Sequence, residues 1–148
     1  MRKVITFLLT LLLFFGLLIV FFLKPINKSY VKINGKQFSV DVAKTDEQKE
    51  KGLDVYETLP VKKGMVFIFQ AADYYPFWMK GMKFPIDIIY INNNKIVDIF
   101  PELSNPKTST ESPIIVKPST KSNFVLEINA GLSRKYNFKT GDTVEIHL

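Results

Sequence analysis

The chain begins with a long, unbroken stretch of apolar residues. Residues 4–23 carry no charged side chain, and only two threonines and one glycine interrupt the leucine, phenylalanine, isoleucine and valine residues. As a helix this stretch would be about 30 Å long, the thickness of the hydrocarbon core of a bilayer. It exceeds the apolar core of a signal peptide, and residues 23–27 offer no small-residue cleavage site. We therefore predict an uncleaved transmembrane anchor over residues 1–23, with a cleaved signal peptide as the alternative.

The charges that flank this stretch nearly balance. Arg2 and Lys3 precede it, and three lysines follow it by residue 32, so the positive-inside rule gives only a weak orientation. Because the N-terminal tail is too short to form a domain, we expect it in the cytoplasm. The sequence thus predicts a single-pass protein of the cell membrane, with residues 4–23 in contact with lipid and the domain on the extracytoplasmic side. The absence of cysteine agrees with that location and excludes a lipoprotein anchor.

After the apolar stretch the pattern changes to a short polar linker and then to alternating segments. Residues 24–29 contain a proline and an asparagine and are typical of a linker. Apolar and polar residues then alternate over residues 31–42 on either side of Asn34-Gly35, a pair that tolerates the positive φ angles of a type I′ turn. We therefore expect a domain over residues 30–148 that begins with a β-hairpin.

The rest of the pattern predicts short strands and very little helix. Thr45 and Gln48 fit a capping box for a short polar helix over residues 46–51 that ends at Gly52, and a helical turn is expected over residues 131–136. The sequence therefore predicts a mainly β fold, a compact small β-barrel or a rolled antiparallel sheet with one or two short helices, preceded by the transmembrane helix. The strands are expected at 65–69, 77–80, 86–91, 95–100, 124–128 and 143–148, with a short one at 114–116 inside a long polar loop.

Two charged residues lie within the most apolar part of this domain, residues 77–91. Lys80 and Asp87 are hard to place in water there, and a polar side chain that cannot reach solvent needs a partner or a function. If residues 81–84 form the turn of a hairpin, then Trp78, Lys80 and Asp87 share one face. The lysine and the carboxylate would be diagonal neighbours, about 7 to 8 Å apart at the backbone. These three residues are the candidate ligand-binding residues.

Two interpretations of this cluster stay open. In the first, Lys80 and Asp87 form a structural ion pair that holds the hairpin in register. In the second, they line a pocket in which Lys80 binds an anionic group while Trp78 stacks on a ring or a sugar face. The partner would then be an anionic small molecule or a sugar. A lysine and an aspartate in contact can also act as an acid–base couple, so the sequence leaves open whether the protein is an enzyme.

Other residues narrow the chemistry. The chain has no cysteine and one histidine, His147, so it lacks the residues for thiol catalysis, Ser-His-Asp triads and histidine-rich zinc sites. It has no phosphate-binding loop motif either, and we expect neither a cofactor nor a metal. Glu127 alternates with Leu126 and Ile128 and is predicted on the exposed face of a strand. Asp87 and Glu127 together leave a paired-carboxylate hydrolase open.

The charge balance argues against nucleic acid as a partner. The chain has 20 basic and 14 acidic residues, a formal charge of +6, and without Arg2 and Lys3 the excess falls to +4. The lysines are scattered among acidic residues, with only Lys62 and Lys63 adjacent. Such an excess suits anionic lipid headgroups better than a nucleic-acid backbone. No feature of the sequence identifies a protein partner.

Four segments of the domain resemble a known family. They are GL at 52–53, GMVFIF at 64–69, FWMKGMKFPIDIIYI at 77–91 and VLEINAG at 125–131. In this order they resemble the bacterial and archaeal DUF192 family, and the resemblance extends from about residue 38 to the end of the chain. It implies a small, mainly β domain that is frequently exported behind a signal or an anchor and has no established activity.

The chain departs from the family pattern at two places. Family members usually have methionine where this chain has Asp54, with an arginine soon after, and asparagine and threonine where it has Gly81 and Met82. If those side chains help to build a site, this chain has an altered version of it. The kept positions are Trp78, Lys80, Pro85, Asp87, Asn129 and Gly131.

Taken together, the sequence predicts a membrane-anchored extracytoplasmic domain that acts as a small-ligand binding or accessory module at the cell envelope. Two alternatives stay open. The domain is a small envelope hydrolase or lyase that uses Lys80 and Asp87, or it is a structural partner of another membrane protein.

Overall fold

The computed structural model describes residue 14, residues 29–108 and residues 110–148. Almost all of the predicted anchor (1–23) and linker (24–29) lies outside these residues. Within the described part of the chain, no helix is long and apolar enough to cross a membrane. The anchor, its orientation and the cell-membrane location stay predictions from the sequence.

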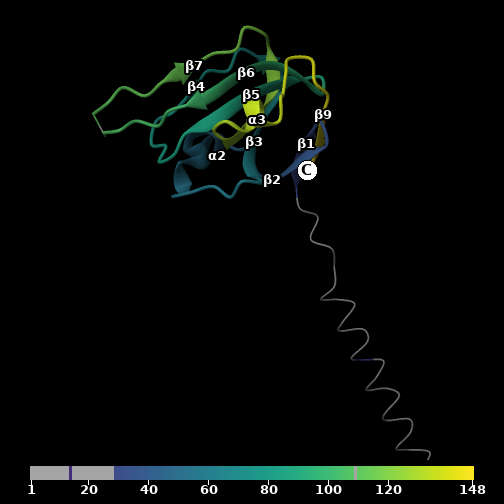
Figure 1. The fold of residues 1–148 in the computed structure, drawn as a ribbon, viewed down its shortest axis with the longest axis horizontal. Coiled ribbons are helices and arrows are strands. Elements are labelled where there is room, and N and C mark those ends of the chain that lie inside the picture. The colour runs from purple at the N-terminus through teal and green to yellow at the C-terminus, as the bar shows by residue number, and fades with distance from the viewer. Residues whose placement is uncertain (1–13, 15–28, 109) are drawn as a thin grey trace, which may run out of the picture.

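The described residues form a mainly β fold built on one curled sheet of seven strands (Figure 1). The order of strands in this sheet is β6-β5-β8-β3-β2-β1-β9, and β4 and β7 form a separate two-stranded sheet. Two short α-helices and one 3-10 helix complete the described part of the chain, so the prediction of a mainly β fold with one or two short helices is confirmed for these residues. In chain order the elements are β1 (Tyr30–Ile33), β2 (Lys36–Ala43), α2 (Asp46–Lys51), η1 (Gly52–Val55), β3 (Lys63–Asp73), β4 (Phe77–Trp78), β5 (Ile86–Asn92), β6 (Lys95–Leu103), β7 (Ile115–Val116), β8 (Ser122–Asn129), α3 (Leu132–Lys135) and β9 (Val144–His147).

The large sheet curls until its two outer strands meet at one end. Lys95, at the start of β6, forms a bridge with Thr143, just before β9. Beside it, the N–H of Gly141 donates to the Ile96 carbonyl at 2.8 Å, and the N–H of Ile96 donates to the Asp142 carbonyl at 3.0 Å. The result is a half-barrel. It is not wholly antiparallel as predicted, because β2 and β3 run parallel.

Local sequence signals account for the first hairpin and the first helix. Asn34 and Gly35 have φ angles of 48° and 75°, as the predicted turn between β1 and β2 requires. The Thr45 hydroxyl accepts from the Gln48 N–H at 3.2 Å, and the Gln48 side chain accepts from the Thr45 N–H at 3.1 Å. This capping box satisfies donors that the start of α2 would otherwise leave unpaired. The helix ends at Gly52, whose φ angle is 54°.

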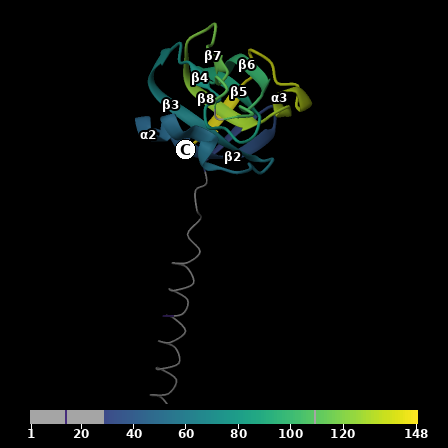
Figure 2. The same cartoon turned by 90° about the vertical axis from the view of Figure 1, so that its left-hand side faces the viewer.

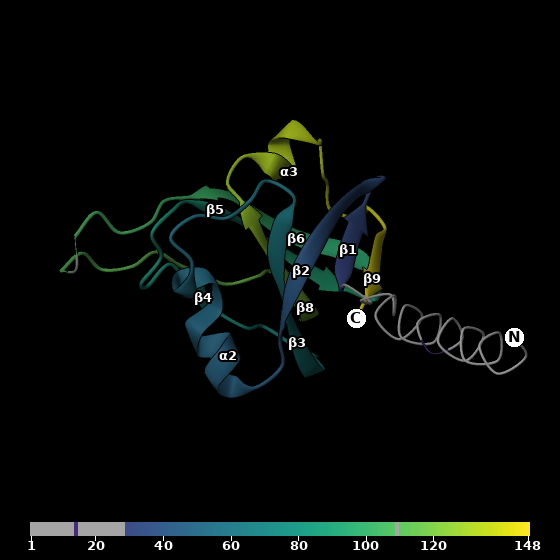
Figure 3. The same cartoon turned by 90° about the horizontal axis from the view of Figure 1, so that it is seen from below.

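Apolar side chains are buried on both faces of the curled sheet. Along β5 the side chains alternate: Ile89 packs in the cluster that includes Leu132 of α3, whereas Ile88 packs in the cluster that includes Leu53 of η1. Accordingly, α2 and α3 lie on opposite sides of the sheet (Figures 2 and 3). A polar side chain on either face of the central strands is therefore shielded from water.

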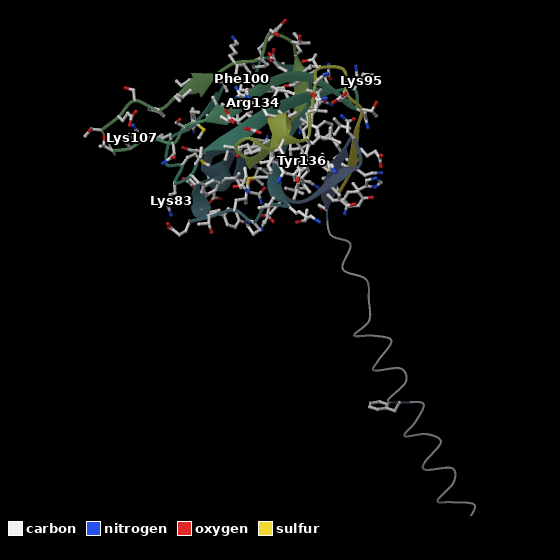
Figure 4. All side chains as sticks on the ribbon, in the orientation of Figure 1. Lys83, Lys95, Phe100, Lys107, Arg134 and Tyr136 are labelled. Carbon is white, nitrogen blue, oxygen red and sulfur yellow. The ribbon has the colours of Figure 1, made fainter. Side chains whose placement is uncertain are left out.

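The predicted hairpin between residues 77–80 and residues 86–91 is wrong. In β4, Trp78 pairs instead with Ile115 of β7, because β5 already has β6 on one edge and β8 on the other. The β4–β7 ribbon lies at the end of the molecule opposite β1 and β9 (Figure 1). In Figure 4, Lys107 marks the loop that projects at this end, and Lys95 marks the opposite end.

Candidate ligand-binding pocket

Asp87 lies on β5 and is fully buried. Its Oδ1 accepts hydrogen bonds from the N–H groups of Glu102 at 2.7 Å and Gly131 at 2.8 Å, and its Oδ2 accepts one from the N–H of Ser133 at 2.7 Å. Gly131 makes this approach with a φ angle of 81°, which favours glycine. Three backbone donors thus compensate the carboxylate, and the carboxylate fixes β6 and the start of α3 against β5.

Lys80 is not the partner of Asp87, so the predicted ion pair is wrong. The lysine is exposed, and it takes part in none of the ion pairs among the described residues. The premise that a buried Asp87 needs a partner is correct, but the backbone supplies it. Three N–H groups stabilise the charged form of a carboxylate without removing a second charge from water.

Asp87 and Glu127 are both buried acids, but they lie on opposite faces of the sheet. In the pairing of β5 with β8, Asp87 is opposite Ile128 and Ile88 is opposite Glu127, and residues opposite each other share a face. Asp87 therefore faces the α3 side, and Glu127 faces the side of α2 and η1. This arrangement removes the paired-carboxylate site that the sequence left open.

A pocket of about 340 Å³ opens on the side of α2 and η1. Small-molecule sites typically have volumes of about 300 to 1,000 Å³. Residues of α2, η1, β3, β8 and the segment from Tyr75 to Met82 line it. Trp78 and Lys80 are both among the lining residues, whereas Asp87 is not. The structure thus brings together two of the three predicted ligand-binding residues and places the third on the other face of the sheet.

The walls of the pocket are aromatic, and their rings hold one another in place. Phe69 stacks on Tyr75 with 3.7 Å between ring centroids, and Phe67 meets the ring of Phe77 edge-on at 4.8 Å. The backbone at Tyr75 is also held in place, because the Tyr75 carbonyl accepts a hydrogen bond from the Tyr90 hydroxyl at 3.1 Å. The edge-on arrangement of Phe67 and Phe77 is one that aromatic rings prefer. The pocket is therefore preformed by ring packing.

Glu127 is the buried charged residue of the pocket. It rises from β8, is only 4% exposed, and its Oε2 has no hydrogen-bond partner. Burial raises the pKa of the Glu127 carboxyl to about 8, so most molecules carry a proton there at neutral pH. A methyl group added to Gly52 would lie 3.8 Å from Oε2, which shows that the backbone at the end of α2 passes close to the carboxyl.

The prediction that Glu127 is exposed is wrong. The side chain does alternate with Leu126 and Ile128, as the sequence indicates, but β8 lies between β3 and β5 and is covered on both faces. The one local signal is that apolar residues stand on both sides of Glu127 in the sequence from Phe124 to Ile128, whereas the order of strands that buries it is not visible in the sequence.

Ammonium groups surround the mouth of the pocket. Lys49 lies 3.7 Å from Asp46 and 4.8 Å from the centroid of the Phe69 ring. Lys51 pairs with Glu47 outside the pocket at 2.9 Å. Lys80 has neither an ion pair nor a side-chain hydrogen bond within the described ranges. It is therefore the lysine of the mouth that is available for an incoming anionic group, beside a Trp78 ring that is 45% exposed.

No group of three or more histidine, cysteine, aspartate or glutamate residues that could hold a metal ion occurs among residues 29–108 and 110–148. The pocket combines an aromatic wall, a buried carboxyl and a cationic mouth.

Comparison with known proteins places the chain in a family. The DUF192 profile, described as "Uncharacterized ACR", matches residues 29–146. Among solved structures, a protein of unknown function from Novosphingobium aromaticivorans DSM 12444 is 27% identical with a TM-score of 0.67, over 82% of this chain and 89% of that one. A protein from Sinorhizobium meliloti 1021, described as a "putative transcription regulator", is 26% identical with a TM-score of 0.71, over 80% of this chain and 93% of that one. No curated protein matches the sequence.

Proposed function

The chain belongs to the DUF192 family, and from this premise we propose that it is a small-ligand binding module whose site is the pocket formed by α2, η1, β3, β8 and residues 75–82. One observation carries the proposal. A buried carboxyl, that of Glu127, is left without a partner beneath an aromatic-walled opening.

The physical argument rests on how costly an unpartnered polar group is. A buried polar group without a hydrogen bond costs about 1 to 3 kcal/mol, and folded proteins contain few of them. Asp87, on the other face of the same sheet, has three backbone donors. Glu127 has an open Oε2 instead. A ligand that enters the pocket would supply the missing partner and would recover this cost.

The mouth indicates what the outer part of the ligand looks like. Trp78 offers a flat ring for a sugar face or an aromatic ring, and Lys80 offers a cation for an anionic group. These are the roles predicted from the sequence for these two residues. Asp87 takes no part in the proposed site. The alternative of a hydrolase or lyase that uses Lys80 and Asp87 lacks the contact between them that it requires.

The sequence also supports a proposal for the location of the module. The apolar, uncharged residues 4–23 support anchoring in the cell membrane, with the pocket on the extracytoplasmic side. Protease treatment of intact cells tests this location. Digestion of the domain is the expected result, and protection from the protease would contradict the location.

The regulator description belongs to the Sinorhizobium meliloti protein. In this chain, the arrangement of basic residues does not support DNA binding. Seven basic residues of the described part are paired with acids rather than gathered in a stripe.

A thermal-shift screen of the full-length protein tests the proposed function. The compounds are cell-wall sugars, anionic metabolites and aromatic carboxylic acids. A ligand at ten times its Kd should raise the stability of the wild type by about 1.4 kcal/mol, a shift of several degrees in Tm for a domain of this size. Lys80→Met should lower the affinity for anionic hits at least fivefold without changing Tm in the absence of ligand.

Lys139→Met is the matched control, because Lys139 is exposed and does not line the pocket. It should leave both affinity and Tm unchanged. A screen without hits, or hits that bind Lys80→Met and Glu127→Gln as tightly as the wild type, would overturn the assignment of the pocket.

A further inference from the structure

The inner part of the pocket differs in chemistry from its mouth. On the sheet side it is lined by Phe67 and Phe69 of β3, and Phe77 packs edge-on against both of these rings. Glu127 is the ionisable side chain that lies near these rings. An occupant therefore meets aromatic faces and one carboxyl at its inner end, and it meets lysines only at its outer end.

Aromatic faces carry negative charge, and they attract cations when the site is shielded from water. The protein already shows this at the mouth, where the ammonium of Lys49 lies 4.8 Å from the centroid of the Phe69 ring. Phe69 in turn packs edge-on against Phe77 at 6.3 Å. The same aromatic wall thus continues from a position that holds an ammonium group toward the carboxyl of Glu127.

We propose that the ligand is an organic amine that enters with its ammonium group first, so that the ammonium pairs with Glu127 and the apolar stem lies along Phe67, Phe69 and Phe77. This proposal rests on the proposed function and specifies the chemical class of its ligand. An anionic group on the same ligand would remain at the mouth, near Lys80. A carboxylate or a phosphate at the inner end would instead lie against the negative faces of the rings and would gain no opposite charge from Glu127.

Binding in this orientation is linked to the loss of a proton. Before binding, Glu127 is mostly protonated at neutral pH, because burial raises its pKa to about 8. Once the ammonium arrives, the carboxylate is the stable form, and the proton passes to the buffer while the ligand keeps its charge. The reaction is a protonated acid plus an ammonium ion giving an ion pair plus a proton.

Other titratable groups also face the pocket. Asp46, Lys49, Glu50 and Lys51 line the pocket from α2, Lys80 lines it from the segment after β4, and Tyr75 lines it from the loop before β4. Tyr90 of β5 faces the same side as Glu127 and stays neutral, since its pKa is raised by burial and by the glutamate itself. Glu127 is therefore the group whose titration sets the pH dependence near pH 8.

A series of three phenyl compounds separates the charge of the ligand from its shape. Phenethylamine, 2-phenylethanol and phenylacetate share a ring and a short stem but end in a cation, a hydroxyl and an anion. We expect the full-length protein to bind phenethylamine at least tenfold more tightly than either of the others at pH 8, measured by isothermal titration calorimetry. At pH 7, titrations in phosphate and in Tris should show the release of about 0.9 protons per amine bound.

The pH dependence gives a second readout. Because only the ionised fraction of Glu127 accepts the amine, the apparent Kd should fall about tenfold from pH 6 to pH 7 and less than twofold from pH 8 to pH 9. Glu127→Gln should remove this dependence and weaken amine binding at least tenfold, while it keeps the affinity for 2-phenylethanol within threefold. Retained alcohol binding would show that the variant is folded with its pocket intact. Glu145→Gln is the matched control, because Glu145 on β9 is exposed and does not line the pocket, and it should behave as the wild type.

The outcomes separate this inference from the proposed function. Tighter binding of the alcohol or of phenylacetate, or amine binding without proton release, would overturn the amine assignment and leave a ligand pocket in place. If none of the three compounds binds and the wider screen also gives no hits, both proposals are wrong.

Discussion

Replacing Asp87 with alanine should remove much of the stability of the domain. The change leaves three backbone N–H groups, of Glu102, Gly131 and Ser133, without the acceptor that they share. An unsatisfied buried donor costs about 1 to 3 kcal/mol. Water can reach the more exposed Glu102 and Gly131 positions, so we expect a loss of about 3 to 6 kcal/mol. Most domains have a free energy of unfolding of only about 5 to 15 kcal/mol.

The measurement is urea unfolding followed by circular dichroism, with the midpoint and the slope fitted for each variant. Asp87→Asn should cost less than Asp87→Ala, because the amide keeps one acceptor oxygen. Ser133→Ala is the matched control. It keeps the backbone N–H that binds Asp87 and removes only a hydroxyl that has no partner among the described residues, so its unfolding free energy should change by less than about 1 kcal/mol.

Lys80→Met completes this test, because it separates the observed arrangement from the ion pair predicted from the sequence. Since Lys80 is exposed and does not contact Asp87, its replacement should change the unfolding free energy by less than about 0.5 kcal/mol. If Lys80→Met proved as destabilising as Asp87→Ala, the lysine would be the partner after all. A loss below 1 kcal/mol for Asp87→Ala would likewise refute the reasoning from the three donors.

Most strands of the fold were predictable because each one has a local signal. Asn34-Gly35 sets the first hairpin, the asparagines before Lys95 set the turn between β5 and β6, and Thr45 with Gln48 sets the start of α2. The pairing of β4 was not predictable in this way. Its partner β7 begins at Ile115, after a long loop, and no local pattern indicates which distant segments will pair.

The site was only partly predictable, for a related reason. Trp78 and Lys80 lie close together on one short segment, and both line the pocket. Whether a charged residue on a strand is exposed depends on what covers that strand, and this depends on the sheet order. Glu127 became buried because β8 is central, and Asp87 found backbone donors because α3 begins beside it. Neither neighbour can be identified from the strand that carries the acid.

Two further predictions follow from the packing on either side of β8. Glu127 has a folded pKa of about 8 against an ordinary value of 4.5, so the folded state holds the extra proton between these pH values. The free energy of unfolding should therefore fall as pH rises through this window, by up to about 5 kcal/mol in all. Glu127→Gln should abolish the decline, and an equal decline in the variant would assign it to other groups. A methyl group at Gly64 would lie 2.6 Å from the Glu127 carbonyl oxygen. Gly64→Ala should therefore separate β3 from β8 and lower the free energy of unfolding in urea by about 3 kcal/mol. Gly35→Ala is the control, because a methyl group there meets no atom within 4 Å, and it should show only the smaller strain of its positive φ angle.

The positions at which this chain departs from the family pattern lie together beside the pocket. A methyl group at Gly81 would lie 3.1 Å from the Asp54 carboxyl, so the side chain missing at 81 makes room for the one present at 54. The third departure, Met82, is buried and lines the pocket, where the family pattern has a hydroxyl. Gly81 thus borders Asp54, and Met82 contributes an apolar side chain to the pocket. Because Met82 is apolar, it adds to the part of the pocket wall that would contact the apolar stem of the proposed ligand.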